Sequence, residues 1–168
     1  MTSENTAKLS FRVRVEVYAA AAKKAEDLGL DLSSFLQDTV EKAVFDYLPA
    51  SVQDRIEKER TLYAKAQQIA RELDAAGRFD EHFNLTVFDA MMADGEVRAL
   101  YEDLIGAGYA EDTPGKTPLN MYLGWFIKNA VPGAEPLLDG GNKPRRVFVK
   151  GQGKAIKSYT LLRKRPKA

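Results

Sequence analysis

Apolar and polar side chains alternate near the amino-terminal end of the chain. Residues 8–15 read Lys-Leu-Ser-Phe-Arg-Val-Arg-Val, so an extended segment would place the apolar set and the basic or hydroxyl set on opposite faces. A single strand cannot satisfy its own backbone hydrogen bonds, and the pattern predicts no further strand before residue 145. We therefore expect this strand to pair with its own copy in a second chain.

The pattern then changes to helical spacing. Apolar residues recur every three or four positions from Val17 to Leu28, where Gly29 provides a stop. Asp31 is a suitable N-cap for a second helix, which carries a broad apolar stripe until Pro49 ends it. A stripe this wide is typical of a tight interface between helices.

The order of basic alternating strand, helix, Leu-Gly turn and capped helix resembles the ribbon–helix–helix family of DNA-binding proteins over residues 8–48. The resemblance implies an intertwined homodimer whose paired strands enter the major groove of double-stranded DNA. It assigns base contacts to outward polar residues: Lys8, Ser10 and Arg12. It assigns inward packing to the apolar set: Leu9, Phe11 and Val13. It assigns phosphate contacts to the Arg14 side chain and to the backbone amides of Leu32 and Ser33.

The chemistry of the strand agrees with these assignments. A two-stranded ribbon fits the major groove, where an arginine donates two hydrogen bonds to a guanine edge. Backbone amides at a helix N-terminus favour a phosphate. The alternative is an amphipathic edge strand whose polar face simply meets water.

A third helical stretch follows Pro49. Ser51 with Asp54 three residues later approximates a capping box, and apolar residues recur at helical spacing until Gly77, which suits a helix end. Charges of both signs share the rest of this stretch, which is typical of a solvated helix face. We predict a helical connector over residues 51–79.

The sequence of the second half of the chain predicts helices that pack together in a core. Residues 79–105 are apolar and mostly helical, with a break near Asp94 and Gly95. A loop follows, after which Thr117 is a suitable cap for a strongly apolar helix over residues 119–131 that contains the only tryptophan of the chain. We expect this last helix in the core.

A basic hairpin is predicted at the carboxyl-terminal end. Arg145–Lys150 and Lys154–Leu162 have strand character on either side of a glycine turn. Helices followed by a basic hairpin is the order of elements in a winged-helix domain. We therefore expect a mainly α-helical protein with short β elements, divided into a ribbon–helix–helix domain (1–50), the connector (51–79) and an α+β domain (80–168).

Charge is distributed unevenly along the chain. The net charge is only +1, yet residues 143–168 hold ten Lys or Arg and no acidic residue. Such asymmetry favours contact between this end and a polyanion. The predicted phosphate contacts in this region are Arg145, Arg146, Lys150, Lys154 and Lys157. The alternative is a solvated tail that keeps the protein soluble.

Several kinds of chemistry are not supported by the composition. The chain has no cysteine and a single histidine, His82, whose acidic neighbours cannot converge on one metal. The Gly-Gln-Gly-Lys stretch at 151–154 lacks the first glycine and the hydroxyl residue of a phosphate loop. We expect no metal, no cofactor and no enzymatic activity. No stretch has the length of a signal core or membrane span, so a cytoplasmic location is expected.

These patterns together predict a homodimeric, sequence-specific DNA-binding protein, most simply a transcriptional repressor. Two alternatives stay open. The chain could be an antitoxin-type interaction protein, with DNA binding as autoregulation and a protein partner bound through residues 80–168. It could also be an accessory factor for plasmid transfer or partition. These alternatives differ in the role that they give to residues 80–168. The apolar content of that region suffices for an independent fold.

Overall fold

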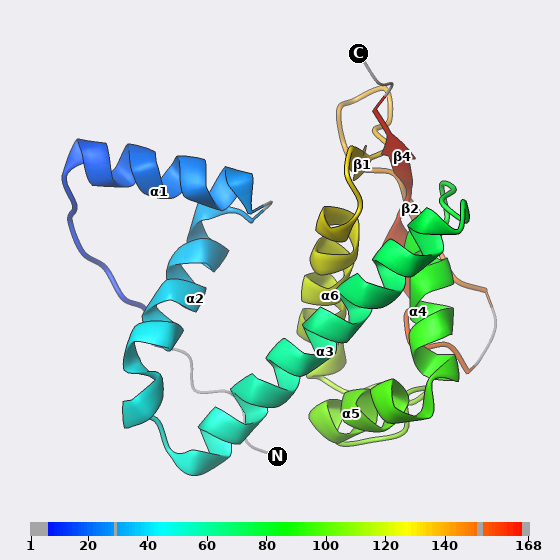
Figure 1. Cartoon of the computed structure of the whole chain (residues 1–168), viewed down its shortest axis with the longest axis horizontal. Helices are drawn as coiled ribbons and strands as arrows, with labels where there is room; N and C mark the ends of the chain where they lie inside the picture. Colours follow the sequence, from blue (N-terminus) through cyan, green and yellow to red (C-terminus); the bar gives the residue numbers. More distant parts are fainter. Residues whose placement is uncertain (1–6, 29, 151–152, 166–168) are drawn as a thin grey trace. The chain divides into compact units, whose positions relative to one another are not determined.

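The computed structural model describes residues 7–28, 30–150 and 153–165 and is mainly helical. Within these ranges six α-helices are accompanied by four short strands, which form two antiparallel two-stranded sheets (Figure 1). The prediction of a mainly α-helical protein with short β elements is confirmed. The chain divides into two compact units, of which the first ends at Val44 and the second begins at Phe45.

The first unit consists of two helices, α1 (Val15–Asp27) and α2 (Leu32–Val44). Residues 7–14 precede them and form neither helix nor strand in the single chain. Helix α1 begins two residues earlier than predicted, because the carbonyl of Arg14 already accepts a hydrogen bond from the amide of Tyr18 at 3.0 Å. The predicted stop at Gly29 lies outside the described residues.

The predicted N-cap of α2 is present. Asp31 Oδ1 accepts a hydrogen bond from the amide of Ser34 at 3.0 Å, and its other oxygen accepts one from the Ser34 hydroxyl at 2.8 Å. These bonds satisfy one of the free amides that every helix N-terminus exposes. They also hold the pKa of Asp31 below its usual range, chiefly through the backbone amide of Ser34.

The first unit has almost no core of its own. Ala25 is the only apolar side chain that it buries among the described residues, and none of the residues of α2 is buried. A two-helix unit of this size cannot bury enough apolar surface to offset the conformational entropy lost on folding.

The second unit begins with the 3₁₀ turn η1 (Phe45–Tyr47) and the long helix α3 (Ala50–Ala75). This helix is not a solvated connector, because it packs against α4, α5 and α6 and buries three small or medium residues completely: Leu62, Ala66 and Ala70. The predicted division at residues 50 and 79 therefore differs from the compact units, in which α3 belongs to the carboxyl-terminal core.

The N-terminus of α3 differs from the sequence prediction, whereas its C-terminus agrees with it. The capping box of Ser51 and Asp54 is not formed, since the helix starts after Pro49 and has no side-chain cap. Asp54 instead forms an ion pair with Lys58 at 2.8 Å. At the other end Gly77 adopts a φ of +72°, a conformation that favours glycine, and terminates the helix as predicted.

Helices α4 (Phe83–Ala93) and α5 (Gly95–Ile105) meet at the predicted break. Asp94 caps α5, because its Oδ1 accepts hydrogen bonds from the amides of Glu96 at 2.9 Å and Val97 at 3.0 Å. The two helices supply much of the core through fully buried side chains: Phe83, Val87, Met91, Val97 and Tyr101.

Helix α6 (Lys116–Ala130) is a core helix, as predicted. It starts directly after Gly115, so Thr117 lies inside the helix instead of capping it. One face of α6 is buried through Leu119, Leu123 and Ile127. Trp125, on another face, is only half-buried.

The predicted basic hairpin is present as a pair of short antiparallel strands, β2 (Arg146–Phe148) and β3 (Ser158–Thr160). Arg146 lies opposite Thr160 in the register, and Phe148 lies opposite Ser158. Two residues of the predicted glycine turn, 151 and 152, lie outside the described residues. A second sheet was not predicted: β1 (Ala134–Pro136) pairs with β4 (Leu162–Lys164).

The carboxyl-terminal strands form part of the core. The strands β3 and β4 and the residues next to them contribute five buried apolar side chains, namely Ala155, Ile156, Tyr159, Leu161 and Leu162. The amide of Leu162 also donates to the carbonyl of Glu81 at 3.1 Å, which fastens the strand to the start of α4.

Candidate functional site

The amino-terminal segment presents its polar and apolar side chains to solvent alike. The predicted base-contacting residues Lys8, Ser10 and Arg12 are exposed, and so is Arg14. The alternate residues Leu9, Phe11 and Val13 are 71%, 59% and 47% exposed. Apolar side chains so exposed in an alternating row are the feature expected of a strand that lacks its partner.

The N-terminus of α2 carries the second predicted phosphate contact. The amide of Ser34 is taken by the Asp31 carboxylate, whose pKa is also lowered by the amide of Ser33. A phosphate bound to the amides of Leu32 and Ser33 would therefore be repelled by the negative charge of Asp31 at the same helix end. The Asp31 carboxylate therefore disfavours anion binding at this position.

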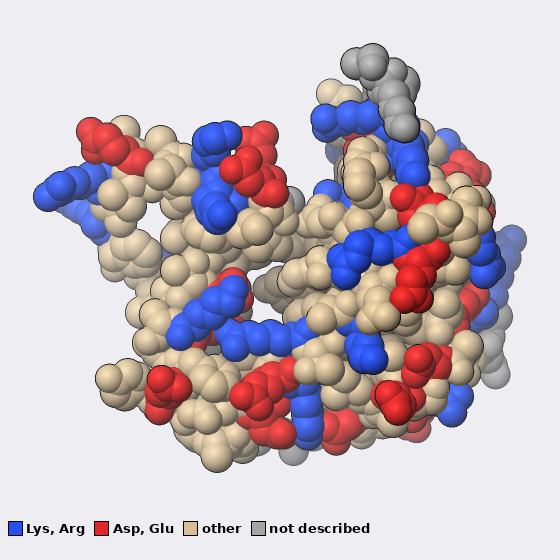
Figure 2. All heavy atoms as spheres, in the orientation of Figure 1, with Lys and Arg blue, Asp and Glu red and all other residues tan. Residues whose placement is uncertain are grey.

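Five bases of the carboxyl-terminal run form ion pairs with acidic residues from elsewhere in the chain. Lys154 Nζ lies 2.9 Å from Asp89 Oδ1, and Lys157 Nζ lies 2.5 Å from Asp112 Oδ2. The same kind of pairing continues in β4 and just beyond it: Arg163 and Arg165 with Glu135, and Lys164 with Asp74. Figure 2 shows the result, since Lys, Arg, Asp and Glu are interspersed on the visible face of the second unit.

These ion pairs lower the pKa values of two acidic partners, Asp112 and Glu135. Lys157 lowers the pKa of Asp112, first through its hydrogen bond and then through its charge. Arg165, with Arg163, lowers the pKa of Glu135 in the same way. The acid-free run in the sequence therefore does not become an unopposed positive surface in the folded unit.

Three bases of the hairpin differ from the others. Within the described residues no carboxylate lies within 4 Å of Arg145, Arg146 or Lys150, and all three are exposed. Arg146 donates from its guanidinium to the Ser158 hydroxyl at 3.0 Å. Of the five predicted phosphate contacts in this region, these three form no ion pair in the described structure, although the charge of Arg145 helps to lower the pKa of Asp139 after the amides of Lys143 and Gly141.

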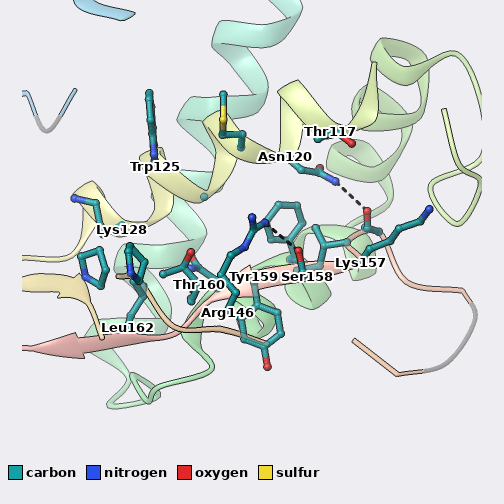
Figure 3. A pocket seen from close by; sticks show the side chains of 18 of the residues that line it. Thr117, Asn120, Trp125, Lys128, Arg146, Lys157, Ser158, Tyr159, Thr160 and Leu162 are labelled. Atoms are coloured by element: carbon teal, nitrogen blue, oxygen red, sulfur yellow. Dashed lines mark hydrogen bonds between the residues drawn. The ribbon is translucent and has the colours of Figure 1, made fainter. Parts of the chain in front are cut away.

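A groove of about 530 Å³ lies between one face of α6 and the β2–β3 hairpin, with Asn84 and Phe88 of α4 among the residues that line it. Figure 3 shows Arg146 between Lys128 and Lys157, with Asn120 reaching toward the segment before β3. Asn120 Nδ2 donates to the carbonyl of Ala155 at 3.1 Å. The same asparagine accepts from the buried hydroxyl of Tyr101 at 2.8 Å.

The described residues that line the groove include four bases and no aspartate or glutamate: Lys116, Lys128, Arg146 and Lys157. Lys116 is only 5% exposed, and its ammonium donates to the carbonyls of Tyr109 at 2.6 Å and Glu111 at 2.7 Å. Burial lowers its pKa. Burial also lowers the pKa of Lys128, with the charge of Arg165 as a further cause.

His82 has a structural position. It directly precedes α4, and its Nδ1 lies 2.7 Å from the hydroxyl of Tyr159, whose ring it meets edge to face. Among the described residues no three His, Cys, Asp or Glu side chains gather closely enough to hold a metal ion. No helix within the described ranges has the length and hydropathy of a membrane span.

Two parts of this arrangement were missed in the sequence. The acids that pair with the basic run lie between residues 74 and 135, far from it in the chain. The groove had a weak signal, because polar and small residues recur on one face of the apolar helix α6: Thr117, Asn120, Gly124 and Lys128. A helix wholly in a core would carry apolar residues there.

Comparison with models of protein families, with curated proteins and with solved structures found no match to this chain. Its function is therefore inferred from the chemistry and placement of its residues.

Proposed function

We propose that the chain is a homodimeric, sequence-specific DNA-binding protein of the ribbon–helix–helix kind, acting as a transcriptional repressor. In the proposed dimer, residues 8–14 of two chains pair as an antiparallel ribbon that enters the major groove. The observation that carries the proposal is the first unit, which buries only Ala25 among its described apolar side chains while an alternating apolar row stays exposed.

A second copy is the occupant that best fits this surface. The exposed row of Leu9, Phe11 and Val13 has the period of a strand, and the described residues 7–14 belong to no helix or strand in the single chain. Pairing two identical segments would join their backbone groups in hydrogen bonds and bury both rows, at roughly 1–2 kcal/mol for each apolar side chain covered. The isologous contact also closes the assembly at two chains.

The opposite face of the segment supports DNA as the ligand. Lys8, Ser10 and Arg12 alternate with the apolar row, and the described part of the segment, residues 7–14, contains no acidic residue. In a paired ribbon these side chains project together. Arginine donates two hydrogen bonds to the guanine edge, and lysine and serine donate to further base or phosphate acceptors.

The hairpin supplies a secondary contact in this proposal. Arg145 and Lys150 are exposed, have no carboxylate within 4 Å in the described structure, and follow helices in the order of a winged-helix domain. They would neutralise phosphates without reading sequence. Lys154 and Lys157 form ion pairs with Asp89 and Asp112, so they are not proposed as phosphate contacts.

In vitro selection from a random duplex pool with the full chain tests the proposal. A two-fold dimer should enrich a motif with two inverted half-sites, because the symmetry of the operator mirrors that of the protein. Sedimentation of the same preparation should give the mass of a dimer. A monomer that enriches no motif would contradict the proposal and favour an interaction protein.

A further inference from the structure

The groove of the second unit has two dissimilar walls. One is a face of α6 on which Thr117, Asn120, Gly124 and Lys128 recur at helical spacing. The other is the β2–β3 hairpin, with Arg146 beside Ser158. Its volume of about 530 Å³ is within the range of small-molecule sites.

The floor of the groove is open at Gly124. A Cβ atom added there would meet no atom within 4 Å, so packing does not require glycine at this position. Glycine in the middle of a helix also lowers helix stability relative to alanine. The space at Gly124 is therefore retained at some cost to α6.

The charged side chains among the described residues that line the groove are all positive. Lys116 and Lys157 already have protein partners, the first with two carbonyls and the second with Asp112. Lys128 and Arg146 have only uncharged partners in the described structure, the Asn129 amide oxygen at 2.5 Å and the Ser158 hydroxyl at 3.0 Å. Lys128 is a partly buried cation without a carboxylate, which is costly, and an anion would offset that cost, while Arg146 is exposed and open to the same anion.

The remaining lining combines uncharged polar side chains with an apolar and aromatic set that includes Phe88, Met121, Trp125 and Ile156. An inorganic ion would leave these side chains uncovered. A purely apolar molecule would leave the cations without a partner. The two kinds of surface together match a ligand that has an anionic group and an apolar body.

We propose that this groove binds a small organic anion, with an aromatic body against the apolar lining and a phosphate or carboxylate group held by Lys128 and Arg146. A DNA duplex is a poorer occupant, since the groove walls enclose Lys128 at half-buried depth on α6. The site is independent of the proposed DNA-binding ribbon, and either assignment could fail without the other.

Trp125 makes the site measurable, because it is the only tryptophan of the chain and lines the groove. Two fluorescent probes with the same body separate the two parts of the proposal. 1-Anilinonaphthalene-8-sulfonate carries an anionic group, and N-phenyl-1-naphthylamine lacks it. Energy transfer from Trp125 to each probe, titrated on the full-length protein, reports binding in or near the groove.

Variants then locate each probe. Gly124→Met should fill the groove and abolish transfer to both probes, while Gly124→Ala, which adds only a methyl group, should retain it. The double variant K128Q/R146Q should weaken the anionic probe about tenfold or more and leave the neutral probe unchanged. The matched control K65Q/K143Q removes two exposed bases outside the groove and should change neither. Circular dichroism confirms that each variant is folded.

Competition distinguishes the class of anion. Adenosine 5′-monophosphate offers a phosphate and indole-3-acetate a carboxylate on an aromatic body, and displacement of the bound probe by either supports the site. Three results would overturn it. These are equal binding of the anionic probe to Gly124→Met and Gly124→Ala, equal losses in K128Q/R146Q and K65Q/K143Q, and failure of both competitors.

Discussion

Neutralising two exposed bases of the hairpin should reduce the salt dependence of DNA binding. The variant R145Q/K150Q removes bases that have no carboxylate within 4 Å in the described structure. Each phosphate contact contributes a slope of about 0.9 in a plot of log affinity against log salt. Two contacts per chain in a dimer therefore predict a slope reduced by up to about 3.6.

The control for this experiment is a variant with the same change of net charge. K154Q/K157Q also removes two bases per chain, but Asp89 and Asp112 already pair with them. A lysine paired within the protein neutralises no phosphate, so the slope should stay close to that of the wild type. Deleting residues 143–168 is unsuitable as a test, because it removes buried core residues such as Ile156 and Leu162.

Fluorescence anisotropy of a labelled duplex carrying the selected site, measured over a series of potassium chloride concentrations, gives each slope. A wild-type slope in R145Q/K150Q would refute the hairpin contact. Equal reductions in the two variants would also refute it, since the effect would then follow net charge alone.

Four further predictions concern single residues. Arg12→Ala should weaken specific binding by about 1–3 kcal/mol and leave the dimer intact, so an unchanged affinity for the selected duplex would remove Arg12 from the groove. Phe11→Asp should yield monomers in sedimentation, because a charge would enter the shared core; a folded dimer would show that this face is not buried. Asp31→Asn should tighten DNA binding with little change in melting temperature, because asparagine caps helices as well as aspartate without the charge, and an equal dissociation constant would separate α2 from the phosphates. Burial raises the pKa of Tyr101 to about 12 from an ordinary value of 10.0, so its contribution to stability is full below pH 10 and declines as the pH rises toward 12. Tyr101→Phe should flatten that decline in urea titrations, and an unaltered decline would assign it to other groups.

Some local signals predicted the fold well, whereas the capping box of Ser51 and Asp54 and the cap at Thr117 are not formed. Asp31 caps α2 as predicted, because its carboxylate accepts a hydrogen bond from an amide three residues ahead, and the predicted break near Asp94 coincides with the cap of α5. Gly77 ends α3 because its positive φ is accessible to glycine at no steric cost. Each of these depends on residues that are close together in the chain.

Features that depend on distant residues were predicted less well. Helix α3 looked solvated because its charges stand out in the sequence, yet Ala66 and Ala70 are small enough to let other helices approach closely. The hairpin looked strongly basic because Asp89 and Asp112 reach it only after folding. The pairing of residues 8–14 remains a prediction, since it requires a second chain, whereas Val15, which was expected in the strand, begins α1.

The scarcity of core in the first unit has a consequence for how the protein melts. The second unit has its own core, so its unfolding temperature should not depend on protein concentration. The first unit, which buries Ala25 and little else in the single chain, must draw its stability from whatever covers it. If a second chain and DNA cover it, as proposed, mass action should make its unfolding temperature rise with protein concentration and with DNA. A single melting temperature therefore does not describe this chain, and dilution alone should unfold one part of it while leaving the other intact.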